Sequence, residues 1–482
     1  MNLITDPWIP VLFENGKAEL IGLKQLYQDA EIIRDLNVNP PQRIALMRLL
    51  LCITQAALDG PVNEEEWKTC CARITPESLA YLSTRKDKFK LYGETPFLQV
   101  KALASDKPKF LDKLLETSRG ENPMFLSQMA TEGHSVDDAQ KAVALLVFQN
   151  YSAGGKVGQS EWCGKKHSES TFATPCFTNL FLLIRGGNLK ETLQMNLLSK
   201  KQIPIPFGTP IWDQMPQSST DDNAFQNAYC TFLGRLVPLA RLVKLSENKQ
   251  SPHCIIGPVP KKYVFSNDPA TFRESFSTLK LSKKNEHYYM KVNPSQHLWR
   301  ELGSLLAMGS NTEGFSAINL KNLKYFDEKV VDIWCGGLAR GAQAAKIQDM
   351  AEWNFSIPAS MLDDEQMENY SKGIELANKA EWTLKKAIQT DGKSYSKELK
   401  IDGEGYSRKA TTHYWSTLDS SYQMLVDIAS DEGRNLDDWR NLLRKTMHEA
   451  FEQACPHETP RQIKAYVQAK RLLEIKEKKR DA

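Results

Sequence analysis

The side chains best suited to chemistry in this chain lie in two glycine-rich stretches. The first, Gly154–Gly158, carries Lys156, and the second, Gly336–Lys346, carries a lone Gln343. Glycines let a backbone approach another molecule closely, so a long polar side chain between small neighbours can project as a probe. Lys156 and Gln343 are therefore candidate contacts to a polar ligand.

Each stretch also has an ordinary structural interpretation. Gly336–Gly337 can be a turn that ends the apolar strand Val330–Trp334, with the following alanines starting a helix. The stretch Gly154–Gly158 can be a linker after the amphipathic helix predicted for Ala139–Gln149. Its spacing matches neither the phosphate-binding loop nor the dinucleotide fingerprint, so no nucleotide cofactor is predicted.

The histidines and cysteines form no catalytic or metal-binding pattern. The eight histidines make no zinc-protease motif, and the nine cysteines make no C-x-x-C pair. The pairs Cys163 with His167 and His253 with Cys254 each supply two ligands, whereas a structural zinc ion takes four. We therefore predict reduced thiols, no metal, no cofactor and no enzymatic activity.

The elements that must position these residues indicate an α+β protein. A chain of 482 residues exceeds one usual hydrophobic core. Residues 1–360 mix short strand and helix patterns, including a hairpin around Glu14–Lys17, and predict a large, irregular mixed domain. Residues 361–482 predict an all-α four-helix bundle, with helices at Met367–Thr390, Lys409–Ile428, Leu436–Ala454 and Pro460–Lys478.

Positive charge is concentrated in two blocks. Lys261–Arg300 holds eight basic and three acidic residues, and Arg461–Arg480 holds eight basic and two acidic residues, although the net charge of the chain is only +3. Such blocks suit phosphate contacts, and a solvated helix face would have the same composition. Within the first block, Lys261–Phe265 is predicted to be a strand.

Nothing in the sequence indicates a membrane protein. No apolar run approaches the length that spans a bilayer, and Met1–Trp8 lacks the basic and apolar segments of a secretion signal. We expect a cytoplasmic protein without a membrane partner.

Recognition of double-stranded DNA through its minor groove requires residues of the kinds found in the two glycine-rich stretches. Backbone and small residues fit the narrow minor groove, and Lys or Gln donates to acceptors on base edges. A side chain inserted between base pairs also starts to separate them, at a cost of roughly a few kcal/mol per step.

Four motifs occur in an order that resembles the CasA family, the large subunit of the type I-E CRISPR Cascade complex. They are Met1–Val11, Phe148–Gly155, Gly336–Ala344 and Thr412–Trp415. The resemblance implies a non-catalytic subunit that recognises the protospacer-adjacent motif of double-stranded DNA through the minor groove and starts strand separation for R-loop formation. The implied partners are guide RNA, the backbone and small subunits of Cascade, target DNA and a helicase-nuclease.

The resemblance also implies a role for individual residues. Lys262 would be a lysine finger on base acceptors, with Lys261 as its competitor, and Gln343 would be a wedge below the motif. The other implied DNA contacts are the glycine loop (Gly154, Gly155, Lys156, Gly158) and the small residues that flank the wedge (Gly341, Ala342, Ala344). Phe125 and Ser127 match a loop near the 5′ end of the guide RNA or the entering duplex.

The chain departs from its relatives at two points. Relatives often carry Asn before the wedge glutamine, where this chain has Ala342, and some carry a cysteine cluster before the finger, where only His253 and Cys254 are present. Two other functions remain open. One is a helical scaffold or RNA-binding protein without sequence readout, and the other is an enzyme that holds a phosphorylated substrate at the Gly154 loop.

Overall fold

The chain divides into two compact units in the computed structural model. Unit 1 comprises Met1–Pro294, Gly314–Asp327 and Val331–Ser356, and unit 2 comprises Ser295–Glu313, Glu328–Val330 and Ile357–Ala482. The structure describes residues 1–114, 136–174, 176–177, 179–248, 251, 253–263, 265, 269, 272–282, 284–295, 297–306, 315–325, 329–340, 347–431 and 434–473. The mixture of helices and strands confirms the predicted α+β class.

The core of unit 1 is organised around α2 (Pro40–Leu58), a helix buried on most sides. The Asn39 side chain caps it by accepting a hydrogen bond from the backbone N–H of Gln42 at 3.0 Å, and the two prolines at its start need no donor there. The helix packs against α4 (Cys71–Ser83), α5 (Asp138–Tyr151) and α8 (Phe232–Leu236). A helix that buries most of its surface must be covered on most sides, so distant segments converge on it.

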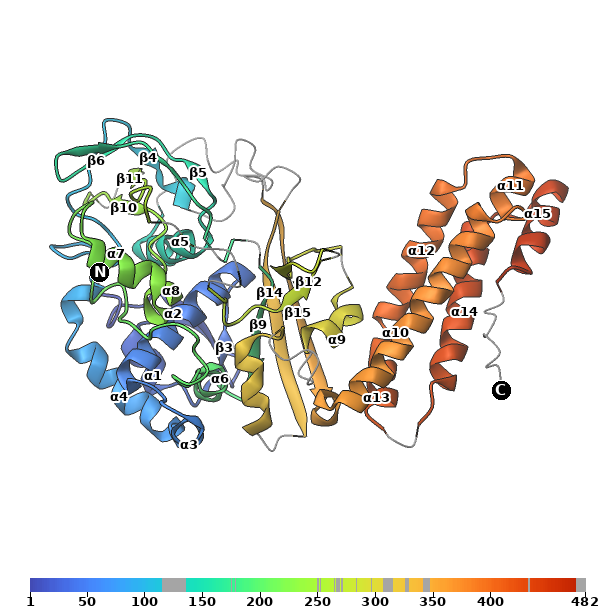
Figure 1. The fold of residues 1–482 in the computed structure, drawn as a ribbon, viewed down its shortest axis with the longest axis horizontal. Coiled ribbons are helices and arrows are strands. Elements are labelled where there is room, and N and C mark those ends of the chain that lie inside the picture. The colour runs from blue at the N-terminus through green and yellow to red at the C-terminus, as the bar shows by residue number, and fades with distance from the viewer. Residues whose placement is uncertain are drawn as a thin grey trace. The chain divides into compact units, whose positions relative to one another are not determined.

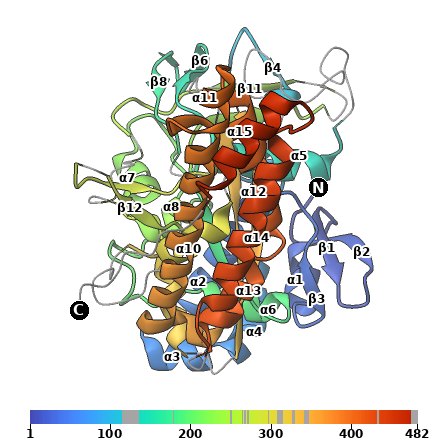
Figure 2. The same cartoon turned by 90° about the vertical axis from the view of Figure 1, so that its right-hand side faces the viewer.

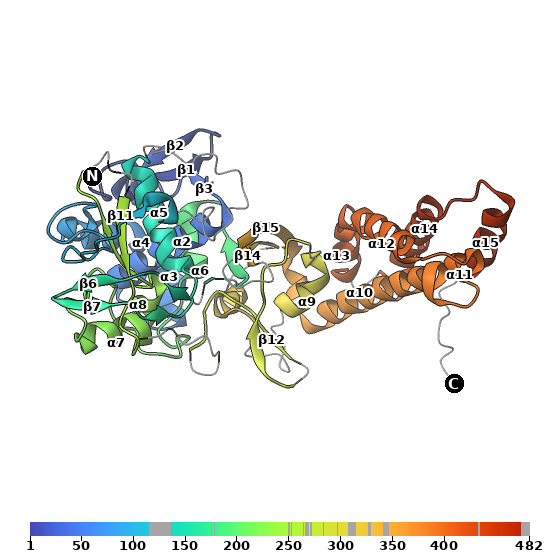
Figure 3. The same ribbon diagram turned by 90° about the horizontal axis from the view of Figure 1, so that it is seen from above.

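Small antiparallel sheets surround this core. The N-terminal sheet, at one edge of unit 1 in Figure 3, has the order β2-β1-β3. The second has the order β10-β11-β4, and the third, whose strands lie side by side in Figure 1, has the order β15-β14-β9. Two-stranded ladders pair β5 with β8, β6 with β7 and β12 with β13.

The bounds of the strands are β1 (Ile9–Phe13), β2 (Ala18–Ile21), β3 (Ile33–Leu36), β4 (Lys109–Phe110), β5 (Gly155–Lys156), β6 (Ser160–Trp162), β7 (Lys165–His167), β8 (Ser170–Thr171), β9 (Phe181–Arg185), β10 (Leu242–Leu245), β11 (His253–Gly257), β12 (Leu279–Leu281), β13 (His287–Tyr289), β14 (Val330–Arg340) and β15 (Ile347–Pro358). The remaining helices of unit 1 include α1 (Leu23–Gln28), α3 (Glu64–Thr69), α6 (Leu189–Asn196), α7 (Asp222–Cys230) and the 3₁₀ helix η5 (Ile318–Tyr325). The predicted N-terminal hairpin is confirmed by the pairing of β1 with β2.

The interpretation of Gly336–Gly337 as a turn is wrong, because β14 continues through both residues to Arg340. A Cβ atom on Gly336 would lie 2.5 Å from the ring of Trp334, and one on Gly337 would lie 2.9 Å from the carbonyl oxygen of Asn179. These glycines therefore let neighbouring groups pack closely inside unit 1.

Unit 2 is largely helical. The helices α10 (Asp364–Lys385), α12 (Glu404–Asp419) and α14 (Asp437–Ala454) pack against one another, as Figure 2 shows. Buried polar atoms fasten this packing: the indole N–H of Trp439 donates to the carbonyl of Gly373 at 2.9 Å, and the hydroxyl of Tyr414 donates to the carbonyl of Ala377 at 3.0 Å. The shorter helices are α9 (Leu302–Leu305), α11 (Tyr395–Leu399), α13 (Tyr422–Ala429) and α15 (Pro460–Lys470).

The single helix predicted for Lys409–Ile428 is wrong, because the chain forms α12 and α13 with a break at Ser420–Ser421. Both serine hydroxyls donate back to the carbonyl of Thr417, at 2.8 and 3.3 Å, which competes with continued helix formation. The boundary near residue 360 and the four-helix arrangement stay predictions. No helix in the described part of the chain is long and apolar enough to cross a membrane.

Candidate nucleic-acid interface

The Gly154 loop follows α5 directly and is more ordered than a linker. The strand β5 (Gly155–Lys156) pairs antiparallel with β8, placing Gly155 opposite Thr171 and Lys156 opposite Ser170. Gly154, Gly155 and Lys156 are exposed. The loop therefore presents its backbone and one lysine to solvent from a fixed ladder.

Glycine is required at several loop positions for distinct reasons. A Cβ atom on Gly154 would lie 3.1 Å from the backbone nitrogen of Ala173, which is tighter than ordinary contacts. Gly155 and Gly158 have φ angles of +115° and +108°, a region that residues with side chains rarely adopt. The loop conformation is therefore specific to glycine, and the space beside Gly155 is open.

A buried clamp lies behind the loop. The Gln149 side chain accepts hydrogen bonds from the backbone N–H groups of Ala240 and Arg241, at 2.9 and 3.1 Å, and donates to the carbonyl of Arg241 at 2.9 Å. The Arg241 guanidinium then donates to the carbonyl oxygens of Ala240 and Ala153. Burial lowers the pKa of Arg241 to about 10, so this cation depends on the carbonyl groups that surround it.

The clamp joins the end of α5 to the chain just before β10. Thr174 adds a second attachment, because its hydroxyl donates to the carbonyl of Asn150 at 2.5 Å and its backbone N–H donates to that of Ser152 at 3.0 Å. The Nε atom of Arg241 is buried without a partner among the described residues, but the several other hydrogen bonds of Gln149, Arg241 and Thr174 attach the first residues of the loop to two separate segments.

The far side of the loop meets a second sheet. A Cβ atom on Gly158 would lie 3.7 Å from the ammonium nitrogen of Lys109, which belongs to β4. The strand β4 pairs with β11, and Lys109 lies opposite Cys254. A Cβ atom on Gly257, at the end of β11, would clash with the hydroxyl of Ser160. The chain that leads from β11 to Lys262 thus starts beside the end of the glycine loop.

Lys262 lies in a turn, so the strand predicted for Lys261–Phe265 is wrong. The backbone N–H of Tyr263 donates to the carbonyl of Pro260 at 2.9 Å, which closes a turn where the predicted strand would begin. The Lys262 ammonium group pairs with the carboxylate of Asp222, which also accepts from the hydroxyl of Tyr263. Asp222 starts the body of α7, and the ring of Tyr263 stacks on Phe225 of that helix at 4.0 Å. Helix α7 therefore positions the candidate finger.

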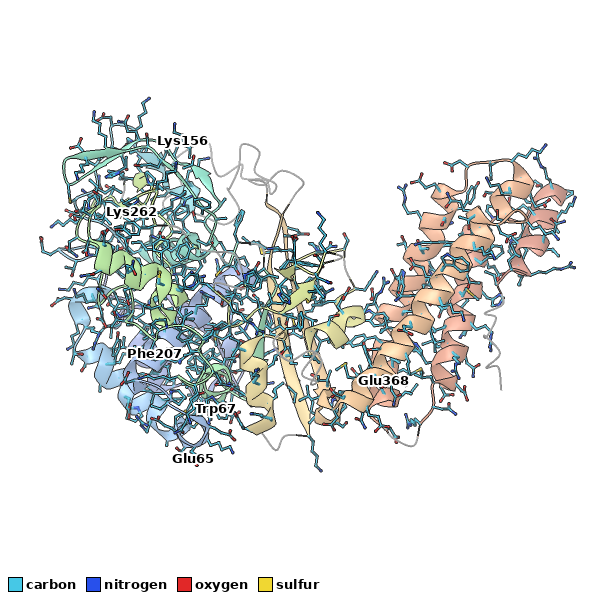
Figure 4. All side chains as sticks on the ribbon, in the orientation of Figure 1. Glu65, Trp67, Lys156, Phe207, Lys262 and Glu368 are labelled. Atoms are coloured by element: carbon cyan, nitrogen blue, oxygen red, sulfur yellow. The ribbon has the colours of Figure 1, made fainter. Side chains whose placement is uncertain are left out.

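Lys156 and Lys262 both lie in the upper part of unit 1 in the view of Figure 4. Lys261 is also exposed, and no ion pair joins it to another described residue. The proposed wedge and its neighbours, Gly341, Ala342, Gln343 and Ala344, lie outside the described residues, as do Phe125 and Ser127.

The two cysteine and histidine pairs have other partners. The ring of His253 lies against Phe110, with ring centres 4.8 Å apart, and the thiol of Cys254 is 3.9 Å from the carbonyl oxygen of Phe110. His167 is buried, with Nδ1 3.5 Å from the carboxylate of Glu169. Within the described ranges, no three His, Cys, Asp or Glu side chains are grouped to hold a metal ion.

Sequence reasoning missed the residues that support the site. Gln149 lies within one of the four ordered motifs, in the last turns of α5, so its place in that motif was an available signal. No sequence signal pointed to Asp222, Lys109 or Arg241, because each of these residues reaches the site from a different segment of the chain.

Comparison with known proteins agrees with this architecture. The family model of CRISPR-associated protein Cse1 matches residues 2–450. The CRISPR-associated protein CasA/Cse1 of Thermus thermophilus is 27% identical over 484 aligned positions, which cover 93% of this chain and 91% of that protein.

Solved structures share the fold at lower identity. The structure of Thermus thermophilus CasA (Cse1) has a TM-score of 0.77 at 23% identity, covering 98% of this chain and 99% of that chain. A chain from a CRISPR RNA-guided surveillance complex has a TM-score of 0.75 at 19% identity, with coverage of 98% and 99%. The match of the family model over nearly the whole length is decisive: the chain belongs to the CRISPR-associated protein Cse1 family.

Proposed function

We propose that this chain is the large, non-catalytic subunit of an RNA-guided Cascade complex and that it recognises the protospacer-adjacent motif of double-stranded DNA. Family membership supports the assembly with guide RNA and other Cascade subunits. The observation that carries the recognition step is the exposed Gly154–Gly158 loop, with two residues at positive φ, held by the buried Gln149 and Arg241 clamp.

In this proposal the loop enters the minor groove. A backbone without Cβ atoms fits a groove of about 6 Å, and Lys156 and Lys262 donate to phosphates or base acceptors at its edge. Gln343 acts as the wedge that starts strand separation, an assignment that rests on the sequence resemblance. Replacing a DNA duplex by an RNA–DNA heteroduplex is nearly balanced, so a small push at its start decides the outcome. The complex works in the cytoplasm and passes the opened DNA to a helicase-nuclease.

Alanine substitution of the loop glycines tests the recognition step. The double variant Gly155→Ala/Gly158→Ala in the assembled complex should weaken motif-dependent binding of duplex DNA by about tenfold or more, which corresponds to about 1.4 kcal/mol. Gly164→Ala is the control, because Gly164 has a φ of +72°, no neighbour within 4 Å and a place in the separate β6–β7 hairpin. Equal losses in the control and the double variant would overturn the proposal.

The wedge has a different readout. Gln343→Ala should leave the affinity for the motif largely intact and should slow strand opening. The rate of opening can be measured with a fluorescent base analogue placed next to the motif. Unchanged opening would remove Gln343 from the proposal while leaving the glycine loop in place.

A further inference from the structure

A second cationic feature of unit 1 shares no residue with the Gly154 loop or the Lys262 turn. It is a solvent-accessible cavity of about 520 Å³, within the roughly 300–1,000 Å³ of small-molecule sites. Its lining includes the cations Lys201, Arg273, Lys321 and Lys324, and no carboxylate occurs among its described lining residues. Tyr325 provides an aromatic wall.

One wall of the cavity is the 3₁₀ helix η5. Side chains three residues apart eclipse one another in a 3₁₀ helix, so Ile318, Lys321 and Lys324 form one row. All three line the cavity, with Ile318 buried, Lys321 half-buried and Lys324 exposed. The row therefore runs from an apolar floor to a charged rim.

The helix η5 is held rigidly by two buried amides, Asn319 and Asn322, which lie on the row next to the one that lines the cavity. The Asn322 side chain donates to the carbonyl groups of Met195 and Leu197, both at 2.8 Å, and accepts from Gln202 at 2.9 Å. Asn319 donates to the side chain of Asn196 at 2.8 Å. Gln202 itself lines the cavity next to Lys201. The two walls are thus fastened to each other before any ligand binds, which lowers the entropic cost of binding.

Arg273 completes the charged lining from a third segment. One of its terminal nitrogens donates to the carbonyl of Ser316, whereas its Nε atom is shielded from solvent and makes no hydrogen bond within the described part of the chain. Burial lowers the pKa of Arg273, because the charged form loses hydration. A nearby anion would offset that cost.

The aromatic wall is also fixed in place. The ring of Tyr325 lies 5.4 Å from the ring of Trp67, which Figure 4 labels, and 4.7 Å from the ammonium nitrogen of Lys324. A cavity that combines several cations with an aromatic ring and aliphatic residues matches a ligand with both phosphates and a flat apolar part.

We propose that this cavity binds the phosphate groups of a nucleotide ligand, either along a single-stranded nucleic acid or in a free nucleotide. Convergence of four cations within a volume of nucleotide size favours phosphates, whose charge is denser than that of spaced carboxylates. The proposal goes beyond the recognition of duplex DNA and does not rest on it, because none of the cavity residues belongs to that site.

Binding to the purified full-length chain tests the proposal. Two probes are used. Binding of a short, fluorescently labelled single-stranded RNA is measured by fluorescence anisotropy, and binding of ADP is measured by calorimetry. Lys321→Gln/Lys324→Gln should weaken binding by about tenfold or more. The double variant should also make RNA binding less dependent on salt, with the logarithmic slope falling by about 0.7 for each phosphate that no longer meets a lysine. Binding of ADP identifies free nucleotides as ligands, and binding of RNA alone identifies the nucleic-acid backbone.

A neighbouring pair of lysines gives a matched control. Lys201→Gln removes a lining cation, whereas Lys200→Gln removes a cation whose ammonium group pairs with Asp59 at 2.8 Å and lies 4.6 Å from the ring centre of Phe207. Only the first should weaken binding, with both variants melting at the same temperature as the unaltered chain. Equal losses from both, an unchanged affinity in the double variant, or displacement of RNA by a polyglutamate peptide but not by nucleotides would each overturn the proposal. Failure of the Gly154 loop to recognise DNA would leave this result unchanged.

Discussion

Among single residues, the candidate finger Lys262 forms an ion pair with Asp222, whose carboxylate would compete with DNA for the lysine. Its side chain is 54% exposed and that of Asp222 is 63% exposed, so the ion pair between them lies in water. Exposed pairs of this kind contribute about 0–1 kcal/mol. Lys262 can therefore exchange Asp222 for an acceptor on DNA at little cost in free energy. The strength of the ion pair with Asp222 determines that cost.

Removing the competing charge should strengthen DNA binding. We expect Asp222→Asn to raise the affinity of the assembled complex for motif-containing duplex by a few-fold at low salt, because surface charges are screened as salt increases. Lys262→Ala should lower that affinity, and Lys261→Ala should change it less if Lys262 is the finger. Binding titrations at two salt concentrations measure all three variants. A larger loss in Lys261→Ala would transfer the finger role to Lys261.

At the scale of elements, β14 shows that glycines near the candidate wedge serve the packing of the protein itself. Gly336 and Gly337 are buried in the strand that pairs with β9. The indole N–H of Trp334 donates to the carboxylate of Glu352 on β15 at 2.6 Å, which fixes the ring that a Cβ atom on Gly336 would meet.

Substitution of Gly336 should therefore act on stability. Gly336→Ala forces the Trp334 ring or the strand to move, and overpacking of this kind costs about 1–3 kcal/mol. Urea unfolding of the free chain should show a lower midpoint. Gly392→Ala is the matched control, because Gly392 is exposed with no neighbour within 4 Å. A midpoint for Gly336→Ala equal to that of the control would contradict the packing role.

At the scale of the whole molecule, the nine cysteines report how completely the chain is folded. All are free thiols, and Cys163, at the tip of the β6–β7 hairpin, is the exposed one, while Cys71 and Cys230 are partly exposed. The other six are buried. Burial raises the pKa of Cys176 to about 12, and the thiolate is the reactive form.

One thiol should therefore react fast with a disulfide reagent at pH 8. Cys163→Ser should remove this fast phase, and urea should expose the slow thiols. Because the folded pKa of Cys176 lies above its ordinary value of 9.0, the unfolded chain loses that proton first. The free energy of unfolding should decline as pH rises from about 9 towards 12. Several fast-reacting thiols in the native chain would contradict the described core.

For the whole molecule, some features could be predicted from the sequence and others could not. Helix α5, the β1–β2 hairpin, the glycine character of residues 154–158 and the mixed fold class follow from the sequence alone, because periodicity, turn residues and caps act over a few neighbours. The split between α12 and α13 was missed because serine back-bonding is a local choice that apolar periodicity does not reveal.

The contacts between distant residues depend on the folded chain. Lys262 with Asp222, Arg241 with Ala153 and the cavity shared by Lys201 and Lys321 join segments separated by 40 or more positions. Such contacts depend on the packing of helices around α2 and on strand register, where a shift of one residue reverses every side chain. The kinds of groups available for recognition can therefore be predicted from the sequence, whereas the partner of each group follows from long-range packing.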